Sequence, residues 1–307
     1  MNEQRGLKFS TAGNLIIGMV GVMVAILSHS QAIMLDGVFN LIYFVTGLFT
    51  LKVARLVIRG DDERFPVGYG FFEPLINGIK GLMVLGISVM ALIGAVEALL
   101  SGGRAISLGY ATAYGFFAAV SCWSLALLTH RATNKTGSPL LRADAENWLV
   151  NGAISSAVLL AFLGVYLIRN TSYAYLTPYI DPLLVLTVVL ISISVPIRMA
   201  WKALMELLNR APSAEVVKSV EEVVAISLGD LPVVEAFVRV LQPGRTRMVS
   251  VHVVVPKEHP ISSVGELDEI RTRTLKALQK LHDSTFVDVL FTEDRRWGAP
   301  LGSGDLK

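Results

Sequence analysis

Cysteine and charge are both scarce in this sequence. Of its 307 residues one is a cysteine, Cys122, and 17% are charged. A single cysteine in an apolar stretch excludes a disulfide framework and a cysteine-based metal cluster. The net charge of +2 is too small to indicate a nucleic-acid partner. Apolar residues, in contrast, make up 53% of the chain and its mean hydropathy is +0.57, so most of it is expected to contact membrane lipid.

Six apolar stretches are long enough to cross a bilayer as helices, which takes about 20 residues each. They cover residues 7–27, 31–58, 72–100, 108–129, 143–168 and 178–204. With six spans, most basic residues near the span ends fall on one side: Arg5, Lys8, Lys52, Arg55, Arg59, Arg64, Arg131, Lys135, Arg142, Arg198 and Lys202. Arg104 and Arg169 fall on the other side. This bias predicts cytoplasmic N- and C-termini in a bacterial inner or plasma membrane.

The composition changes after residue 209. Within residues 210–295, the spacing of apolar residues predicts helix, strand, strand, helix and strand, which is the αββαβ order of a ferredoxin-like cytoplasmic domain. The chain is therefore expected to be an α-helical membrane protein over residues 1–209, with a small α+β domain and a flexible tail at 296–307. Alternating valines in "RMVSVHVVV" predict that the small domain folds alone and self-associates.

Two polar residues interrupt the second apolar stretch, "HSQAIMLDGVFNLIYFVTG". They are Asp36 and Asn40, and a carboxylate at membrane depth costs roughly 2.5–3.5 kcal/mol unless it is paired or faces a cavity. Asn147 and Asn151 repeat the same spacing in the fifth stretch. Because residues four apart share one face of a helix, the two pairs can supply four oxygens to one point. The amides could also serve only to join packed helices, but two matching pairs with a carboxylate favour an ion site.

Other carboxylates have less specific interpretations. Asp144 and Glu146 precede Asn147 and either attract a cation to the fifth helix or act as favourable charges at its N-terminus. Glu73 is expected to be structural and to pair with a nearby arginine, Arg55, Arg59 or Arg64. Asp181, followed by a proline, predicts the N-cap of the sixth helix.

Four motifs lie in the same order on these stretches: "AIMLDGVFN", "FPVGYGFFEP", "RADAENWLVN" and "DP". Together with six spans and a short α+β tail, they resemble the cation diffusion facilitator (cation efflux) family of metal-ion/proton antiporters. The resemblance implies a homodimeric transporter rather than an enzyme, with no catalytic residues and no cofactor besides the transported cation. It further implies that each protomer binds one ion between its second and fifth helices and exchanges it for protons by alternating access.

The site residues depart from the usual pattern of that family, which has Asp or His with Asp on the second helix and His with Asp on the fifth. Here the corresponding residues are Asp36, Asn40, Asn147 and Asn151. This oxygen-only set suits Mg²⁺, Mn²⁺, Ca²⁺ or an alkali cation better than Zn²⁺, and Asp36 is its one titratable member. Two alternatives stay open, namely a transport-inactive relative that acts as a partner subunit or sensor, and a carrier of a monovalent or organic cation.

The family's tail domain often binds further metal. His252 and Asp294 match ligand positions of that site, whereas Ala236, Gly265 and Thr292 stand where other ligands are needed. No tail metal site is therefore expected, since such sites require several ligands. Dimer packing is the expected role of the domain.

Overall fold

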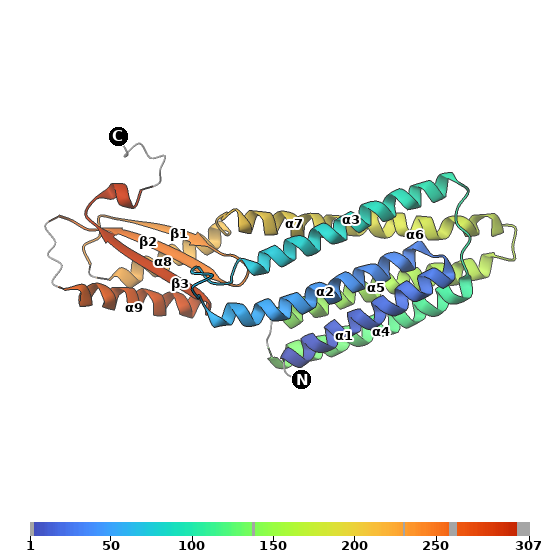
Figure 1. Ribbon diagram of the computed structural model, residues 1–307, viewed down its shortest axis with the longest axis horizontal. Helices are drawn as coiled ribbons and strands as arrows, with labels where there is room; N and C mark the ends of the chain where they lie inside the picture. Colours follow the sequence, from blue (N-terminus) through green and yellow to red (C-terminus); the bar gives the residue numbers. More distant parts are fainter. Residues whose placement is uncertain (1–2, 137–138, 230, 258–262, 300–307) are drawn as a thin grey trace. The chain divides into compact units, whose positions relative to one another are not determined.

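The computed structural model describes residues 3–136, 139–229, 231–257 and 263–299. The chain divides into two compact units, which are considered separately (Figure 1). The first unit contains residues up to 52 together with 76–201. The second contains residues 53–75, which join the second and third spans, and the chain from residue 202 onward.

The predicted six spans are confirmed as six helical stretches that are long and apolar enough to cross a membrane. The first five are single helices: α1 (Glu3–Ser28), α2 (Gln31–Arg59), α3 (Phe72–Leu100), α4 (Leu108–Thr136) and α5 (Pro139–Ile168). The sixth consists of the short 3-10 helix η1 (Ala174–Leu176) followed by α6 (Thr177–Ser192) and α7 (Ser194–Leu207).

The break in the sixth span lies at Ile193, between α6 and α7. Pro196 is the third residue of α7 and has no N–H to donate to the carbonyl of Ser192, one turn earlier. The next backbone bond, from Ile197 N–H to Ile193 O, is long at 3.4 Å. The proline therefore accounts for the interruption.

The helices α1, α2, α4 and α5 pack side by side in the first unit (Figure 1). Helices α1 and α2 approach closely where a Cβ built on Gly21 would lie 2.8 Å from the Cα of Gly37. Glycine at both positions lets the two backbones touch, as small residues do in membrane helix pairs. A separate apolar cluster joins α2, α3 and α6 through residues that include Leu35, Ala95 and Val185.

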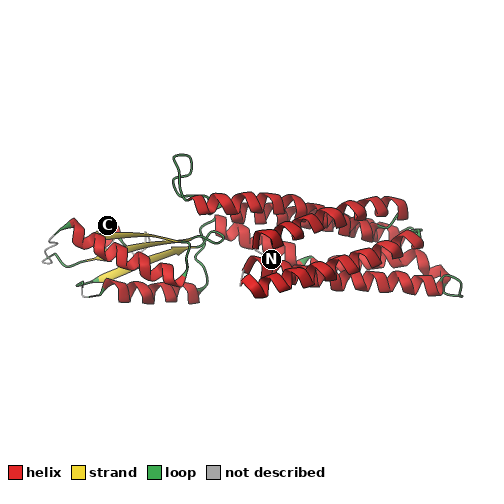
Figure 2. Ribbon diagram, turned by 90° about the horizontal axis from the view of Figure 1, so that it is seen from below, coloured by secondary structure: helices red, strands yellow, loops and turns green. Residues whose placement is uncertain are grey.

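The small C-terminal part has the predicted order of helix, strand, strand, helix and strand. These elements are α8 (Ala214–Leu228), β1 (Glu235–Leu241), β2 (Arg247–Val254), α9 (Val264–Leu281) and β3 (Thr285–Thr292). The sheet order is β1-β2-β3, in which β1 pairs antiparallel and β3 parallel to the central strand (Figure 2). Ser263 caps α9 by accepting a hydrogen bond from the Glu266 N–H at 3.3 Å.

The valines of β2 form the core of this small domain. Val249, Val251 and Val253 are at most 3% exposed and pack with residues of α8 and α9. These valines are therefore covered by the helices of their own domain, and the self-association of the domain stays a prediction. The opposite face of the sheet carries Phe286 and Leu290, which are 50% and 48% exposed.

The chain remains structured beyond β3. Residues 295–297 form a 3-10 turn, η2, whose N-cap is Asp294. Ala299 is buried, and the carbonyl of Gly298 accepts a hydrogen bond from Arg239 Nη2 at 2.8 Å. The rest of the predicted flexible tail, residues 300–307, lies outside the described residues.

Candidate functional site

The α2 pair forms a buried polar group inside the first unit. Asn40 is 2% exposed, and its Nδ2 donates hydrogen bonds to the backbone carbonyl of Asp36 at 2.8 Å and to the Asp36 carboxylate at 3.3 Å. The other end of the amide, Asn40 Oδ1, is buried and has no hydrogen-bond partner within the described part of the chain. An unpaired buried oxygen next to a carboxylate is costly in free energy unless a cation or a water molecule contacts that oxygen.

Tyr114 on α4 completes this polar group, although the sequence analysis did not single it out. Its hydroxyl donates a hydrogen bond to Asp36 Oδ2 at 2.5 Å. The hydroxyl has room because residue 21 of α1 is glycine, since a Cβ built there would lie 2.7 Å from the Tyr114 oxygen. Three helices thus meet around one carboxylate, with Asp36 supplied by α2, Tyr114 by α4 and close backbone packing by α1.

The α5 pair is less enclosed than the α2 pair. Asn147 is exposed and Asn151 is half-buried. Within the described residues, no hydrogen bond joins either amide to Asp36 or Asn40. Assembly of the four residues into one site therefore stays a prediction.

One turn beyond Asn151, α5 contacts α4, the helix that carries Tyr114. Ser155 is buried, and its oxygen lies 4.0 Å from the sulfur of Cys122 on α4. Cys122 in turn is close enough to Asp36 to interact with it electrostatically. The helix that carries the two asparagines therefore approaches the surroundings of Asp36 through α4.

A charged residue of α3 that the sequence analysis did not consider contacts α2 at Tyr43, about one turn beyond Asn40. Lys80 is the one basic residue of α3 in the sequence. Its Nζ lies 4.2 Å from the centroid of the Tyr43 ring on α2, a distance typical of a cation–π contact. Tyr43 follows Asn40 by three residues, and it interacts electrostatically with Asp36. A lysine inside an apolar span is itself a functional signal, because it is costly in lipid.

Asp144 lies in the second turn of α5, five residues after the helix begins at Pro139. The favourable effect of the helix dipole is confined to the first turn, so that interpretation does not account for its position. Its half-buried carboxylate accepts a hydrogen bond from Ser10 of α1 and interacts electrostatically with Lys80. Glu146 is exposed.

The expected N-cap role of Asp181 in its own helix is wrong. The helix α6 begins at Thr177 with Pro178 in its first turn, so Asp181 lies inside it and is fully buried. Its carboxylate instead caps α2.

The carboxylate of Asp181 accepts hydrogen bonds from the Ser30 hydroxyl at 2.5 Å and from the N–H groups of Gln31 and Ala32 at 3.0 and 3.3 Å. Arg104 approaches the same carboxylate at 3.8 Å and donates to Gln31 Oε1 at 2.7 Å. These contacts fix the start of the helix that carries Asp36. Sequence spacing alone could not pair residues 150 positions apart.

The expected partner of Glu73 is also wrong. Its carboxylate pairs with the Arg245 guanidinium and accepts a hydrogen bond from the Arg245 backbone N–H at 2.8 Å. Arg245 belongs to the turn between β1 and β2, so this pair joins the start of α3 to the sheet within the second unit.

The tail residues that match the family's metal positions are engaged in other contacts. His252 Nδ1 lies 3.1 Å from Arg239 Nη1, and partial burial with this neighbouring charge lowers the pKa of His252. Two-point contact with Arg296 holds the pKa of Asp294 at about 2. Within the residues that the structure describes, no group of three or more His, Cys, Asp or Glu side chains could hold a metal ion.

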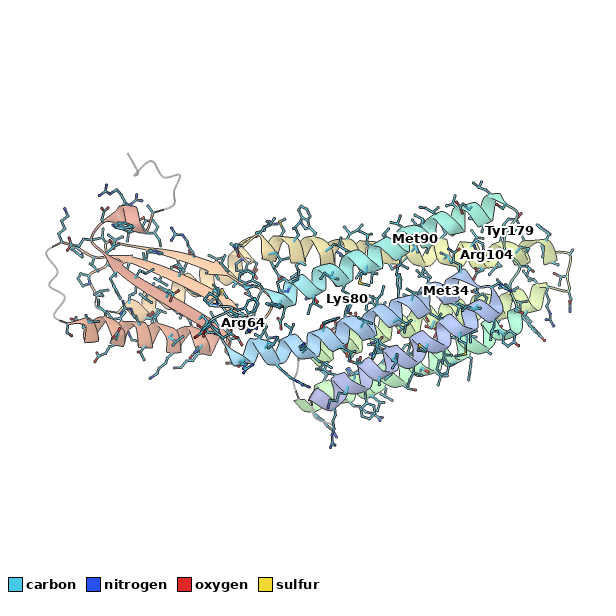
Figure 3. The ribbon with its side chains drawn as sticks, viewed as in Figure 1. Met34, Arg64, Lys80, Met90, Arg104 and Tyr179 are labelled. Carbon is cyan, nitrogen blue, oxygen red and sulfur yellow. The ribbon has the colours of Figure 1, made fainter. Side chains whose placement is uncertain are left out.

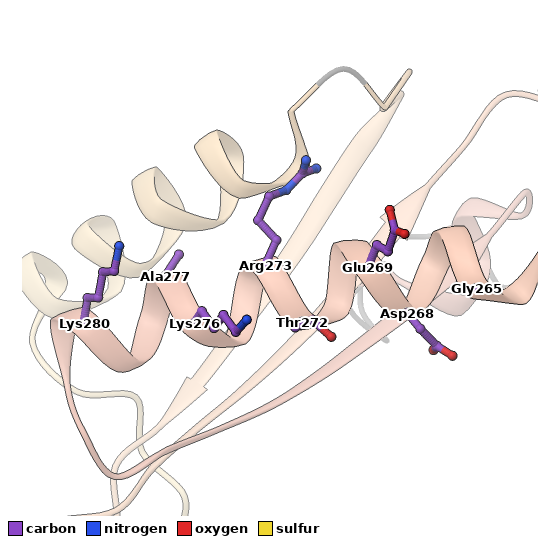
Figure 4. Close-up of a pocket in the computed structure, with 8 residues that line it drawn as sticks. All are labelled: Gly265, Asp268, Glu269, Thr272, Arg273, Lys276, Ala277 and Lys280. Carbon is purple, nitrogen blue, oxygen red and sulfur yellow. The ribbon is translucent and has the colours of Figure 1, made fainter.

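A surface groove of about 610 Å³ runs along α9 from Gly265 to Lys280 (Figure 4). Its side chains carry both signs of charge, with Asp268 and Glu269 toward one end and Lys276 and Lys280 toward the other. It is lined by one helix of the small domain and contains none of the polar residues described for the first unit.

The fold and these polar groups define a multi-pass membrane protein with a carboxylate held among its helices. The sequence model of the cation efflux transmembrane domain matches residues 7–208, which is 202 of the 307 residues. The chain therefore belongs to the cation efflux family of transporters, and the resemblance noted from its motifs is confirmed.

A curated relative is the uncharacterized transporter YdbO of Bacillus subtilis (strain 168). It is 24% identical to this chain over 179 residues, which cover 58% of this chain and 59% of the relative. The match thus spans less than two thirds of the relative's length.

Proposed function

We propose that this protein exports a cation across the membrane by alternating access. In this proposal Asp36 and Asn40 of α2 bind the ion together with Asn147 and Asn151 of α5. Family membership supports the transport of a cation. The proposal adds the position of the ion and the residues that bind it.

The observation that carries the proposal is the state of Asn40 Oδ1. This oxygen is buried and unpaired within the described residues, while the other end of the same amide is fixed by two hydrogen bonds to Asp36. The side chain is therefore held with its carbonyl free. An amide that served only to join helices would use both ends.

The chemistry of the donor set favours a hard cation. A carboxylate and amide oxygens, without imidazole or thiolate, suit Mg²⁺, Mn²⁺, Ca²⁺ or alkali ions. Asn147 and Asn151 would bring the remaining two oxygens when α5 moves toward α2. Such a movement is compatible with their present exposure, because alternating access requires a state in which the site opens to one side.

Proton exchange would use Asp36, since the three asparagines do not titrate. The Tyr114 hydroxyl, 2.5 Å from the carboxylate, is its nearest exchangeable proton in the described residues. The basic residues at the span ends support cytoplasmic termini in the inner or plasma membrane. Export is then movement of the ion out of the cytoplasm.

We further propose that the protein is a homodimer and that its ferredoxin-like tail domain contributes to the interface. The open sheet face supports this, because Phe286 and Leu290 are about half exposed on the face that α8 and α9 leave uncovered. A second copy of the same face would remove them from water.

Transport by purified protein in proteoliposomes tests the proposed function. Vesicles are loaded with a panel of monovalent and divalent cations, and uptake is followed with and without a pH gradient. We expect transport of at least one hard cation and its loss in Asp36→Asn, because that variant offers only neutral dipoles to a dehydrated ion.

The matched control is Asp61→Asn, an identical change at an exposed position in the loop between α2 and α3. It should transport normally. Full transport by Asp36→Asn would contradict the site, and absence of transport for every ion by the unaltered protein would favour a partner subunit or sensor.

Selectivity gives a second test of the same residues. Asn40→Asp combined with Asn147→His rebuilds a mixed nitrogen and oxygen set from the two helices. The double variant should shift ion preference toward Zn²⁺. An unchanged preference, at equal protein level, would show that other residues set selectivity.

A further inference from the structure

Arg247, the first residue of β2, is a buried arginine with few acceptors for its hydrogen bonds. It is 7% exposed. Its guanidinium donates two hydrogen bonds, and both go to Gln242 Oε1, at 3.2 Å from Nη2 and 3.4 Å from Nε. The third nitrogen, Nη1, has no partner in the described part of the chain. Because Gln242 is neutral, this contact does not compensate the positive charge of Arg247.

The other arginines beyond residue 213 have oxygen acceptors of the usual kinds. Four pair with carboxylates: Arg245, Arg271, Arg295 and Arg296. Two donate to backbone carbonyls, namely Arg239 to Gly298 and Arg273 to Leu228. Arg247 is more buried than any of these, yet a single amide oxygen is its side-chain acceptor within the described residues. A buried charge with so few acceptors is costly in free energy unless another group supplies them.

A second unpaired nitrogen belongs to His282, which follows α9. Its Nδ1 is buried and has no hydrogen-bond partner in the part of the chain that the structure describes. Burial and the charge of Arg247 lower the pKa of His282, and Asp283 has a smaller opposite effect, so the two side chains are close enough to interact. The backbone agrees, because the Arg247 N–H donates to the carbonyl of Ser284 at 2.8 Å.

Both side chains can donate hydrogen bonds at neutral pH. Burial lowers the pKa of Arg247, but an arginine titrates so far above pH 7 that its guanidinium stays charged. The lowered pKa leaves His282 neutral at pH 7, and a neutral imidazole carries a proton on Nδ1 in one of its two tautomers. The pair therefore offers one positive charge and hydrogen-bond donors from two elements, β2 and the end of α9.

A phosphate group fits this set of donors. Its oxygens point in several directions, so that it can accept from the guanidinium and the imidazole together, and hydrogen bonds between arginine and phosphate are short and strong. We propose that Arg247 and His282 bind a phosphate group where β2 begins and α9 ends. The inference is independent of the proposed ion site, because no residue of that site takes part in it.

The phosphate can come from a lipid headgroup or from a soluble molecule. Thr246 precedes Arg247, and a Cβ built on Gly70 would lie 3.0 Å from its Oγ1, so this end of the sheet contacts the loop that leads into α3. Figure 3 shows Arg64 of the same loop at this end of the sheet. Because a membrane span begins there, lipid headgroups are one source. Three acidic residues of the loop oppose an anionic membrane surface, so both sources are tested: Asp61, Asp62 and Glu63.

Titration calorimetry of the full-length protein in phosphatidylcholine nanodiscs, with inorganic phosphate as the probe, tests the site directly. We expect one phosphate per protomer. Arg247→Met should weaken binding at least about tenfold, because it removes the charge-assisted hydrogen bonds. Arg247→Lys keeps the charge without the planar fork and should weaken binding less. His282→Phe keeps a flat ring without its nitrogens and should weaken binding about two- to tenfold.

Arg210→Gln is the matched control, since it removes an exposed arginine of the same unit and should change the affinity less than about twofold. Thermal unfolding separates binding from folding. Phosphate should raise the unfolding midpoint of the unaltered protein and leave that of Arg247→Met unchanged. Without phosphate, Arg247→Met should unfold at no lower temperature than the unaltered protein, because it removes a buried charge that lacks acceptors.

Native mass spectrometry distinguishes the two sources of phosphate. The proteins are released from nanodiscs that contain equal amounts of phosphatidylcholine and phosphatidylglycerol. If the source is a lipid headgroup, the unaltered protein should retain one more phosphatidylglycerol per protomer than Arg247→Met. Equal lipid retention, together with phosphate binding that requires Arg247, would identify a soluble phosphate compound as the source.

Two results would overturn the inference. The first is equal binding of phosphate and phosphatidylglycerol by the unaltered protein, Arg247→Met and His282→Phe, or no saturable binding of either by any of them. The second is a phosphate-free Arg247→Met protein that unfolds at a clearly lower temperature than the unaltered protein, because the guanidinium would then already have the acceptors that it needs.

Discussion

Replacement of Asp181 by alanine should destabilise the protein more than any comparable change at an exposed carboxylate. The side chain is fully buried and accepts hydrogen bonds from the Ser30 hydroxyl and from the N–H groups of Gln31 and Ala32. Alanine would leave these three donors without their acceptor and would remove the negative charge that lies 3.8 Å from Arg104. Loss of one partner of a buried, hydrogen-bonded charge costs about 3–5 kcal/mol.

Asparagine at position 181 provides a graded comparison. Its carbonyl oxygen can still accept from the start of α2, but the negative charge and one acceptor are lost. We expect a smaller loss of about 1–3 kcal/mol, within the range for one hydrogen bond to a charged group. The order of stability should be aspartate, asparagine, alanine.

The free energy of unfolding can be measured by titration of sodium dodecyl sulfate into mixed micelles, with helix content followed by circular dichroism. Glu97→Ala is a suitable control, because Glu97 is an exposed carboxylate on α3. It should change stability by less than about 0.5 kcal/mol. An equally small change in Asp181→Ala would refute the capping role.

Three other predictions concern single side chains. Tyr114→Phe should lower the free energy of unfolding by about 1.5–3 kcal/mol in the same assay, because it removes a hydrogen bond to a buried carboxylate. A change below about 0.5 kcal/mol would show that this hydrogen bond does not stabilise the protein. Glu73→Gln should speed tryptic cleavage after Arg245, because it weakens both the ion pair with the Arg245 guanidinium and the hydrogen bond from the Arg245 backbone N–H. An unchanged cleavage rate would show that Glu73 does not hold this turn in place. Leu290→Asp should convert the proposed dimer into a monomer, as measured by light scattering in detergent, whereas Ile226→Asp on α8 should not. The reverse result would place the interface on the helices.

The elements of the fold were predictable because each has its own periodic signal. Long apolar runs predicted the six spans, and alternation with period two predicted the strands. The interruption at Ile193 was not predicted, since an isolated proline such as Pro196 can kink, break or simply begin a helix. Which face of the sheet the two helices cover, the one with the β2 valines, also could not be predicted, because alternation shows two faces without saying which is buried.

The candidate site was only partly predictable. Asp36 and Asn40 stood out because polar residues at membrane depth are costly. Tyr114 did not, since an aromatic residue in an apolar helix has no distinctive pattern, and its role depends on the glycine opposite it on α1. The role of Asp181 could not be inferred because it depends on where α6 begins and on a contact with a helix far away in sequence.

The proposed function requires that the Asp36 carboxylate holds the transported cation. Equilibrium titration of purified protein in nanodiscs, comparing the unaltered chain with Asp36→Asn, tests it most directly. The account predicts one bound cation per protomer in the unaltered protein and at least a hundredfold weaker binding in the variant, equivalent to about 2.7 kcal/mol. Circular dichroism should show that the variant keeps its helices. Binding of equal affinity and stoichiometry by a folded Asp36→Asn protein would contradict the claim.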